Sequence, residues 1–272
     1  MKYALFLGCR IPADLPAYEA STRAVLGRLG VTLVDLPFAC CGYPARSYSR
    51  EAFVVAAIRN LALAERAGLD VLTPCMCCFG TLRHAMRFVE EDSRLQGRVA
   101  DALAAEGLAW PGKVEVAHVL PLLERLVREA GGTKRGSDER IAAHYGCHAL
   151  WPGDVAGVDN PFAPSLFEGL LRAAGKEPVD WPRRLDCCGD PVHAADPTVS
   201  EHMTQAKLAD AAESGAQAIC TACPHCHLRF ADELARPGAP PVRALLVTQV
   251  VGLAMGLPAS SLGLQATARP AP

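Results

Sequence analysis

One tripeptide constrains this chain more than any other feature: two adjacent cysteines followed by glycine, present as Cys40-Cys41-Gly42 and again as Cys187-Cys188-Gly189. Neighbouring side chains of an extended backbone point to opposite sides. Two adjacent thiols therefore reach one metal ion only where the backbone bends sharply, and the glycine that follows them relaxes such a bend. The tripeptide predicts a tight, cysteine-bearing turn that the chain makes twice.

The cysteines around each tripeptide recur in the same order. In each half a Gly-Cys pair comes first, then the tripeptide, then a Cys-x-x-Cys pair, which gives two matched sets: Cys9, Cys40, Cys41, Cys75 and Cys78, then Cys147, Cys187, Cys188, Cys223 and Cys226. Thirty residues lie between the first two groups in the first half and 39 in the second; 33 and 34 residues lie between the second and third groups. This agreement indicates two tandem copies of one module.

The segments between the cysteines follow the same plan in both halves. Helices are expected over 17–30, 49–68 and 79–91 in the first half and over 163–175, 198–215 and 228–235 in the second. Thr198 and Glu201 form a predicted capping box for the fifth of these helices. Short apolar runs, which read as buried strands, precede each cysteine group.

Alternating strands and helices predict an α/β fold in each copy, with a small, open and mostly parallel sheet flanked by helices. The expected domains are residues 1–132 (the first copy) and 138–257 (the second copy), joined by the linker 131–137, and residues 258–272 are expected to be a flexible tail. The carboxyl ends of parallel strands share one edge of the sheet, where ligands bind. The cysteine loops of each copy should therefore converge on one site.

Composition narrows the chemistry of those sites. The net charge of −2 gives no support to a nucleic-acid partner, and the sequence shows neither a signal peptide nor an apolar run long enough to span a bilayer, so a cytoplasmic protein is expected. Twelve cysteines in such a chain favour metal or cluster ligation over disulfides.

Two of the twelve cysteines fall outside the repeat. Alignment of the two Cys-x-x-Cys loops places Cys77 opposite His225 and Cys220 opposite Leu72. We interpret both as spectators, since a lone cysteine ordinarily acts as a small buried hydrophobe. Five matched cysteines per copy exceed the four that close a structural zinc site or an ordinary cubane. The pattern favours a polynuclear iron–sulfur assembly, with zinc as the alternative.

At these residues the chain resembles a known family. The order Cys, tripeptide, CxxC, present twice, is the signature of the cysteine-rich CCG domain. The opening "MKYALFLGCRIPADLPAYEASTRAVLGRLGVTLVDLPFACCGYP" and the later "CPHCHLRF" are similar to the HdrB family, the B subunits of heterodisulfide reductases. The resemblance implies two α/β domains whose ten matched cysteines hold two noncubane [4Fe–4S] clusters. Zinc in place of the first cluster stays an alternative, and the branch of the family that works in sulfur oxidation is also open.

The resemblance further implies an oxidoreductase that acts on sulfur groups. A disulfide between the two clusters would receive two single electrons and two protons and leave as two thiols, or the reaction would run in reverse on thiols or a persulfide. The implied partners are a ferredoxin-like HdrC protein and a flavoprotein of the HdrA type. The alternative is a non-catalytic electron-transfer or scaffold subunit with one cluster in the second domain and zinc in the first.

Two histidines are candidate catalytic residues. His148 follows Cys147 directly, and His225 lies inside the second CxxC. Either could donate a proton to a departing thiolate. The alternative role is a hydrogen bond to a cluster sulfur, which tunes the potential of the cluster.

Overall fold

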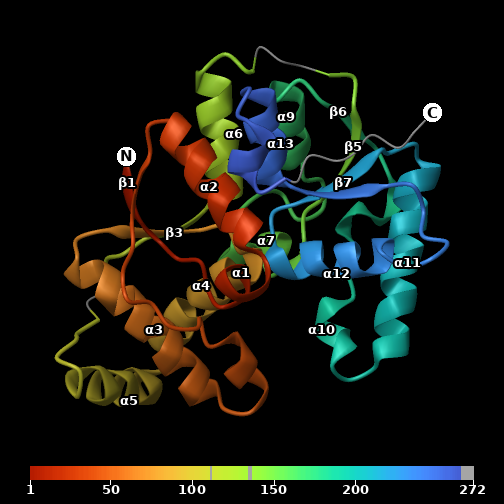
Figure 1. The fold of residues 1–272 in the computed structure, drawn as a ribbon. Helices are drawn as coiled ribbons and strands as arrows, with labels where there is room; N and C mark the ends of the chain where they lie inside the picture. The colour runs from red at the N-terminus through yellow and green to blue at the C-terminus, as the bar shows by residue number, and fades with distance from the viewer. Residues whose placement is uncertain (111, 134–136, 265–272) are drawn as a thin grey trace.

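The computed structural model describes residues 1–110, 112–133 and 137–264 and contains two separate parallel sheets of four strands each (Figure 1). The first sheet has the order β2-β1-β3-β4 and the second the order β6-β5-β7-β8. Their strands are β1 (Lys2–Leu5), β2 (Thr32–Val34), β3 (Asp70–Thr73), β4 (Val116–His118), β5 (Arg140–His144), β6 (Glu177–Val179), β7 (Ala218–Thr221) and β8 (Arg243–Leu246). The predicted α/β fold class is confirmed.

The register of the two sheets is also repeated. In the first, Ala4 pairs with Val34 on one side and Val71 on the other; in the second, Ala142 pairs with Val179 and Ile219. The chain leaves the central strand for one edge of the sheet and then returns to the other side of that strand. The topological switch point, where open α/β sheets bind ligands, therefore lies between β1 and β3 and between β5 and β7.

Helices connect and cover the strands. The longer ones are α2 (Pro16–Arg28), α3 (Arg50–Arg66), α4 (Met76–Glu91), α5 (Ser93–Ala104), α6 (Val119–Glu129), α9 (Leu166–Ala173), α11 (Pro197–Glu213), α12 (Pro224–Leu234) and α13 (Val247–Ala254). Short helices lie next to the cysteine loops in the sequence: α1 (Arg10–Asp14), η1 (Tyr43–Ser47), α7 (Cys147–Leu150), α8 (Gly153–Ala156), η2 (Pro182–Leu185) and α10 (Asp190–His193). Helix α5, between β3 and β4, has no counterpart between β7 and β8 among the described residues.

The predicted capping box at Thr198 and Glu201 is wrong. Helix α11 begins at Pro197, and its N-cap is Asp196, whose carboxylate accepts a hydrogen bond from the backbone N–H of Val199. Proline is favoured at the first helical position because its missing N–H would be unpaired there in any case. The Asp-Pro pair therefore starts the helix earlier than the Thr-x-x-Glu pattern suggested.

The two copies pack against each other through matched pairs of helices, which lie side by side in Figure 1. Helix α13 of the second copy packs on α2 of the first, and α6 of the first copy packs on α9 of the second. Nearer the cysteines, α4 packs on α7 and α1 touches α12. A buried hydrogen bond of 2.7 Å joins the hydroxyls of Ser21 and Thr248 across the α2–α13 contact. The arrangement brings both switch points toward the middle of the molecule.

The first part of the C-terminal tail is packed against the rest of the protein. The 3₁₀ helix η3 (Ala259–Leu262) lies against α2, and Leu262 is fully buried. The remainder of the tail that the sequence predicts to be flexible, residues 265–272, lies outside the described residues, as do positions 134–136 of the linker. Within the described ranges, the longest helices are too short or too polar to traverse a lipid bilayer.

Candidate metal centres

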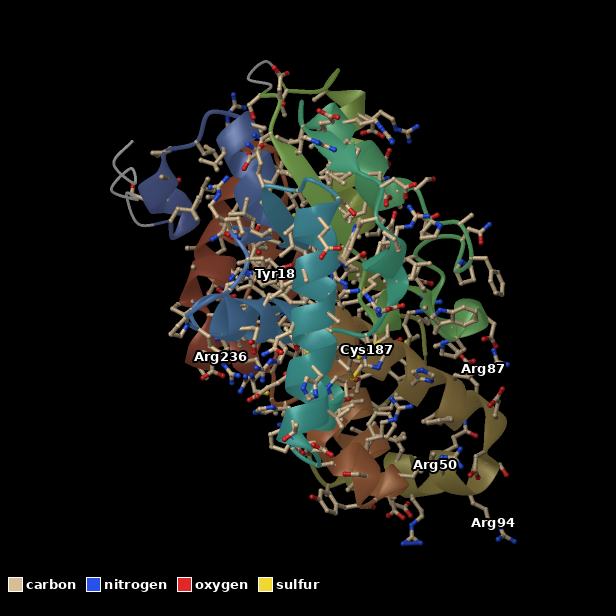
Figure 2. All side chains as sticks on the ribbon, turned by 90° about the vertical axis from the view of Figure 1, so that its right-hand side faces the viewer. Tyr18, Arg50, Arg87, Arg94, Cys187 and Arg236 are labelled. Atoms are coloured by element: carbon tan, nitrogen blue, oxygen red, sulfur yellow. The ribbon has the colours of Figure 1, made fainter. Side chains whose placement is uncertain are left out.

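The matched cysteines lie at the carboxyl ends of the strands. Cys9 follows β1, and the first CxxC opens α4 directly after β3, so both groups flank the switch point of the first sheet. Cys147 and the second CxxC take the same places after β5 and β7. Figure 2 shows Cys187 toward the middle of the view, whereas Arg87 and Arg94 lie at its edge. None of the twelve cysteines, all within the described residues, forms a disulfide.

The glycine of each tripeptide adopts a conformation that other residues avoid. Gly42 has a φ of 90° and Gly189 a φ of 95°. A Cβ atom would lie 2.6 Å from the carbonyl oxygen of Phe53 at the first position and 2.7 Å from that of Ser200 at the second. The glycine therefore serves two purposes: it turns the chain after the cysteine pair, and it lets the backbone of the next long helix approach.

Different side chains hold the two cysteine turns in place. In the first copy, buried Asn60 accepts a hydrogen bond from the backbone N–H of Ala39 at 2.8 Å and donates one to the carbonyl of Cys40 at 3.0 Å. The matched position on α11 is Lys207, whose fully buried ammonium donates to the carbonyl of Asp186 at 2.8 Å. Burial lowers the pKa of Lys207 to about 8. The second turn is thus held by a buried cation and the first by a neutral amide.

The first cysteine set is compact. The Sγ atoms of Cys9 and Cys40 are 3.9 Å apart, and the backbone N–H of Cys78 donates to the Sγ of Cys75 at 3.3 Å. Hydrogen bonds from Cys40 and Cys78 lower the pKa of Cys41 to about 3, against the opposing effect of burial. A cavity of about 90 Å³ opens on this set; its lining includes all five matched cysteines together with Arg10, Tyr43 and His225.

The second cysteine set shows the same behaviour. Hydrogen bonds from Cys147 and Cys188 lower the pKa of Cys187 to about 2. The Sγ atoms of Cys188 and Cys226 and a ring nitrogen of His144 all lie within 4.8 Å of one another, and all three residues are buried. Each copy therefore offers a group of sulfur donors that includes at least one cysteine of lowered pKa.

These donors fit a thiolate-bound metal group. Two thiolates that bind one tetrahedral ion at about 2.3 Å are about 3.8 Å apart, close to the 3.9 Å between Cys9 and Cys40. Iron–sulfur clusters and structural zinc both take cysteine thiolates. The number of matched donors, five per copy, exceeds the four of a closed zinc site. The described residues thus support metal or iron–sulfur binding in both copies.

Both predicted catalytic histidines lie at the junction of the copies. The ring of Tyr43, from the first copy, stands edge-on to His148 at 5.8 Å and near His225 at 6.3 Å between centroids. His225 Nδ1 is 3.0 Å from a carboxylate oxygen of Asp190. Burial opposes protonation of His225, but the Asp190 carboxylate and a negative charge on Cys223 raise its pKa above the ordinary value. Burial lowers the pKa of His148.

The two cysteines outside the repeat lie in different surroundings. Cys220 is fully buried in β7, and burial raises its pKa, as expected for a thiol that packs as a hydrophobe. Cys77 instead places its Sγ 3.7 Å from that of Cys223 in the other copy and lines the cavity of the first set. The residue inside each CxxC, Cys77 or His225, thus reaches across to the other copy. The spectator role of Cys77 stays a prediction.

Comparison with known sequences shows the family to which the chain belongs. The family model of the cysteine-rich CCG domain matches residues 3–83 and 141–231. The B subunit of the ferredoxin/F420H2-dependent CoB-CoM heterodisulfide reductase of Methanosarcina acetivorans is 33% identical over 285 residues, a match that covers 98% of this chain and 93% of the relative. The chain belongs to the HdrB family.

The chain is also similar to proteins that are not named as heterodisulfide reductase subunits. The chain is 34% identical to the membrane anchor subunit of the 8-methylmenaquinol:fumarate reductase of Wolinella succinogenes, over 97% of this chain and 95% of the relative. A hypothetical protein from Helicobacter pylori superposes with a TM-score of 0.73 at 18% identity and covers 96% of this chain and 50% of its own length. That structural likeness shows the fold alone.

Sequence reasoning missed His144. The residue ends β5, and the register of Gly8 with Gly146 places it opposite Phe6 of the first copy. The available signal was a histidine that follows the apolar run "IAA", three residues before a matched cysteine. A histidine on an apolar strand that leads into a cysteine loop is a candidate for the same site.

Proposed function

We propose that this chain is the disulfide-reducing iron–sulfur subunit of a heterodisulfide reductase-type complex. One observation carries the proposal: a chain of this family presents five matched cysteines at the carboxyl ends of the strands in each of two sheets. In the proposal each set holds a noncubane [4Fe–4S] cluster, the first through Cys9, Cys40, Cys41, Cys75 and Cys78 and the second through Cys147, Cys187, Cys188, Cys223 and Cys226.

The reaction needs two electrons and two protons for each disulfide that becomes two thiols. When bound, iron–sulfur clusters supply electrons one at a time, which gives a physical reason for two sites in one chain. The packing of α1 on α12 and of α4 on α7 brings the two sites together at the junction of the copies. A disulfide at that junction would be within reach of both.

Residues of this chain line the junction between the copies and can supply protons there. Cys9 is exposed, so the first set has an edge open to solvent. The ring of Tyr43 lies near both His148 and His225, and Asp190 orients the ring of His225. In the proposal these two histidines donate the protons that the leaving thiolates take up.

The partners follow from the relatives. The Methanosarcina acetivorans protein is named as the B subunit of a ferredoxin- and F420H2-dependent enzyme, which is an assembly of several subunits. We propose that electrons reach this chain from a ferredoxin-like HdrC protein, which receives them from a flavoprotein of the HdrA type. The same reaction run in reverse would oxidise thiols.

The test is a reduction assay on anaerobically purified, iron- and sulfide-reconstituted protein with a reduced viologen as donor. CoB-CoM heterodisulfide, for which the relatives are named, and a panel of small disulfides are the substrates. We expect two thiols to form for every two viologen electrons consumed, and less thiol from His148→Phe and His225→Phe. A loaded protein that passes electrons to a dye but releases no thiol from any disulfide would refute the proposal.

Electron transfer to a dye without release of thiol would instead support an electron-transfer or scaffold subunit. The similarity to a fumarate reductase membrane anchor subunit favours this alternative. In that case iron would be confined to the second copy, with zinc in the first.

A further inference from the structure

His144 is a buried imidazole without a hydrogen-bond partner. Its side chain is fully buried at the end of β5, and neither Nδ1 nor Nε2 has a partner among the described residues. Buried polar groups in native proteins are nearly always paired, and an unpaired one costs about 1–3 kcal/mol. His118, which is equally buried, leaves one ring nitrogen unpaired instead of two, because its Nδ1 accepts the backbone N–H of Leu120 at 3.0 Å.

The donor atoms nearest to this imidazole are sulfurs of the second set. A ring nitrogen of His144 and the Sγ atoms of Cys188 and Cys226 lie within 4.8 Å of one another. These three residues come from β5, from the tripeptide turn and from α12, so separate parts of the second copy converge there. The ring of Phe230 stands edge-on to His144, at 5.1 Å and 78°, and limits its rotation.

No such nitrogen is available at the matched position of the first copy. That position is Phe6, which is fully buried and packs against Phe38 at 5.1 Å between ring centroids. Histidine nitrogen binds iron and zinc at a distance similar to that of thiolate sulfur. It also replaces cysteine in some iron–sulfur centres, where it raises the reduction potential.

We propose that His144 is a nitrogen ligand of the metal centre of the second copy, in addition to the matched cysteines. The inference rests on the proposed function, because it assumes that the second set holds a metal centre. It makes the two centres chemically different, with sulfur ligands alone in the first and mixed sulfur and nitrogen ligands in the second.

The test uses pulsed electron paramagnetic resonance on the reconstituted full chain labelled with ¹⁵N-histidine, in a paramagnetic state of the second centre. We expect a strong ¹⁵N coupling in the wild type and its loss in His144→Phe, which carries the residue found in the first copy. His118→Phe and His202→Phe are matched controls and should retain the coupling. If His144→Phe does not fold, His144→Gln must lose the coupling.

Three results would overturn the inference: no histidine coupling in the iron-loaded wild type, a coupling only as weak as that of a hydrogen bond to sulfide, or a strong coupling that survives in a folded His144 variant. A chain that takes up no iron and sulfide would refute the proposed function instead. Iron and sulfide analysis of the same samples separates the two failures.

Discussion

The two copies of the module share a backbone but differ in the side chains around their cysteines. Strand order, register and the left-handed glycine of the tripeptide are common to both. Close to the cysteines, the first copy has Phe6, Arg10, Asn60 and Cys77 where the second has His144, His148, Lys207 and His225. The shared features make a cysteine-lined switch point, and the differences decide the chemistry of each.

The differences include a change in charge. The second copy gains three imidazoles and a buried ammonium, and that ammonium also lies 4.7 Å from the ring of Trp181. The counterpart of Lys207 in the first copy is the neutral Asn60. Buried positive charge stabilises thiolates and any anionic group that they hold. Lys207 therefore favours negative charge beside the second cysteine turn, whereas the cation near the first set is Arg10, which lines its cavity.

The largest effect is expected where the copies agree. Gly42→Ala and Gly189→Ala should each lower the free energy of unfolding by about 2–3 kcal/mol, because both combine a left-handed backbone with a clash against a helix carbonyl. Urea unfolding of the metal-free chain measures the loss. Gly97→Ala, inside α5 with open space around it, is the control and should be neutral or slightly stabilising. A wild-type midpoint for either tripeptide variant would show that the turn tolerates a side chain.

A smaller loss of stability is expected from the side chains that hold the two cysteine turns, and here the two copies should differ in reduction potential. Asn60→Leu and Lys207→Met should each cost about 1–3 kcal/mol, since backbone groups of the cysteine turn lose buried partners. Only Lys207→Met removes a charge, so only this variant should lower the reduction potential of the neighbouring centre. Redox titration of the reconstituted variants checks the difference. Equal shifts in both variants would contradict the assigned role of the buried cation.

A third comparison concerns the two interfaces between the copies. The α2–α13 contact holds the Ser21–Thr248 hydrogen bond, whereas the matched positions of the α9–α6 contact are Leu166 and Leu120. Ser21→Ala should cost about 1 kcal/mol, and a double-mutant cycle with Thr248→Val should show coupling between the two residues. Additive losses would mean that the hydroxyls do not depend on each other.

The smallest effect is expected from the unmatched cysteines. Cys77→Ser and Cys220→Ser should both retain the iron content of the wild type. Cys77 is the more demanding test, because its Sγ lies 3.7 Å from that of Cys223. Iron analysis of both variants decides the matter, and a clear loss from Cys77→Ser alone would make it a ligand that crosses from the first copy to the second.

Much of the fold could be read from the sequence because the repeat supplied it twice. Matched cysteine spacings fixed the register between the copies, and strand–helix alternation gave parallel sheets with cysteines at one edge. The fourth strands and the reciprocal packing of α2 on α13 depend on contacts between distant residues, which periodicity does not reveal. Alignment also treated Cys77 and His144 as ordinary residues, since only the packed structure places one beside Cys223 and the other beside Cys188.

The central claim is that each copy holds its own iron–sulfur centre. The direct measurement is the content of iron and acid-labile sulfide in anaerobically prepared wild type, Cys40→Ala and Cys187→Ala, with zinc determined on the same samples. We predict that each variant loses about half of the iron and sulfide of the wild type, because each lacks one ligand of a different centre. Iron loss from Cys187→Ala alone, with zinc in the first copy, would contradict the claim.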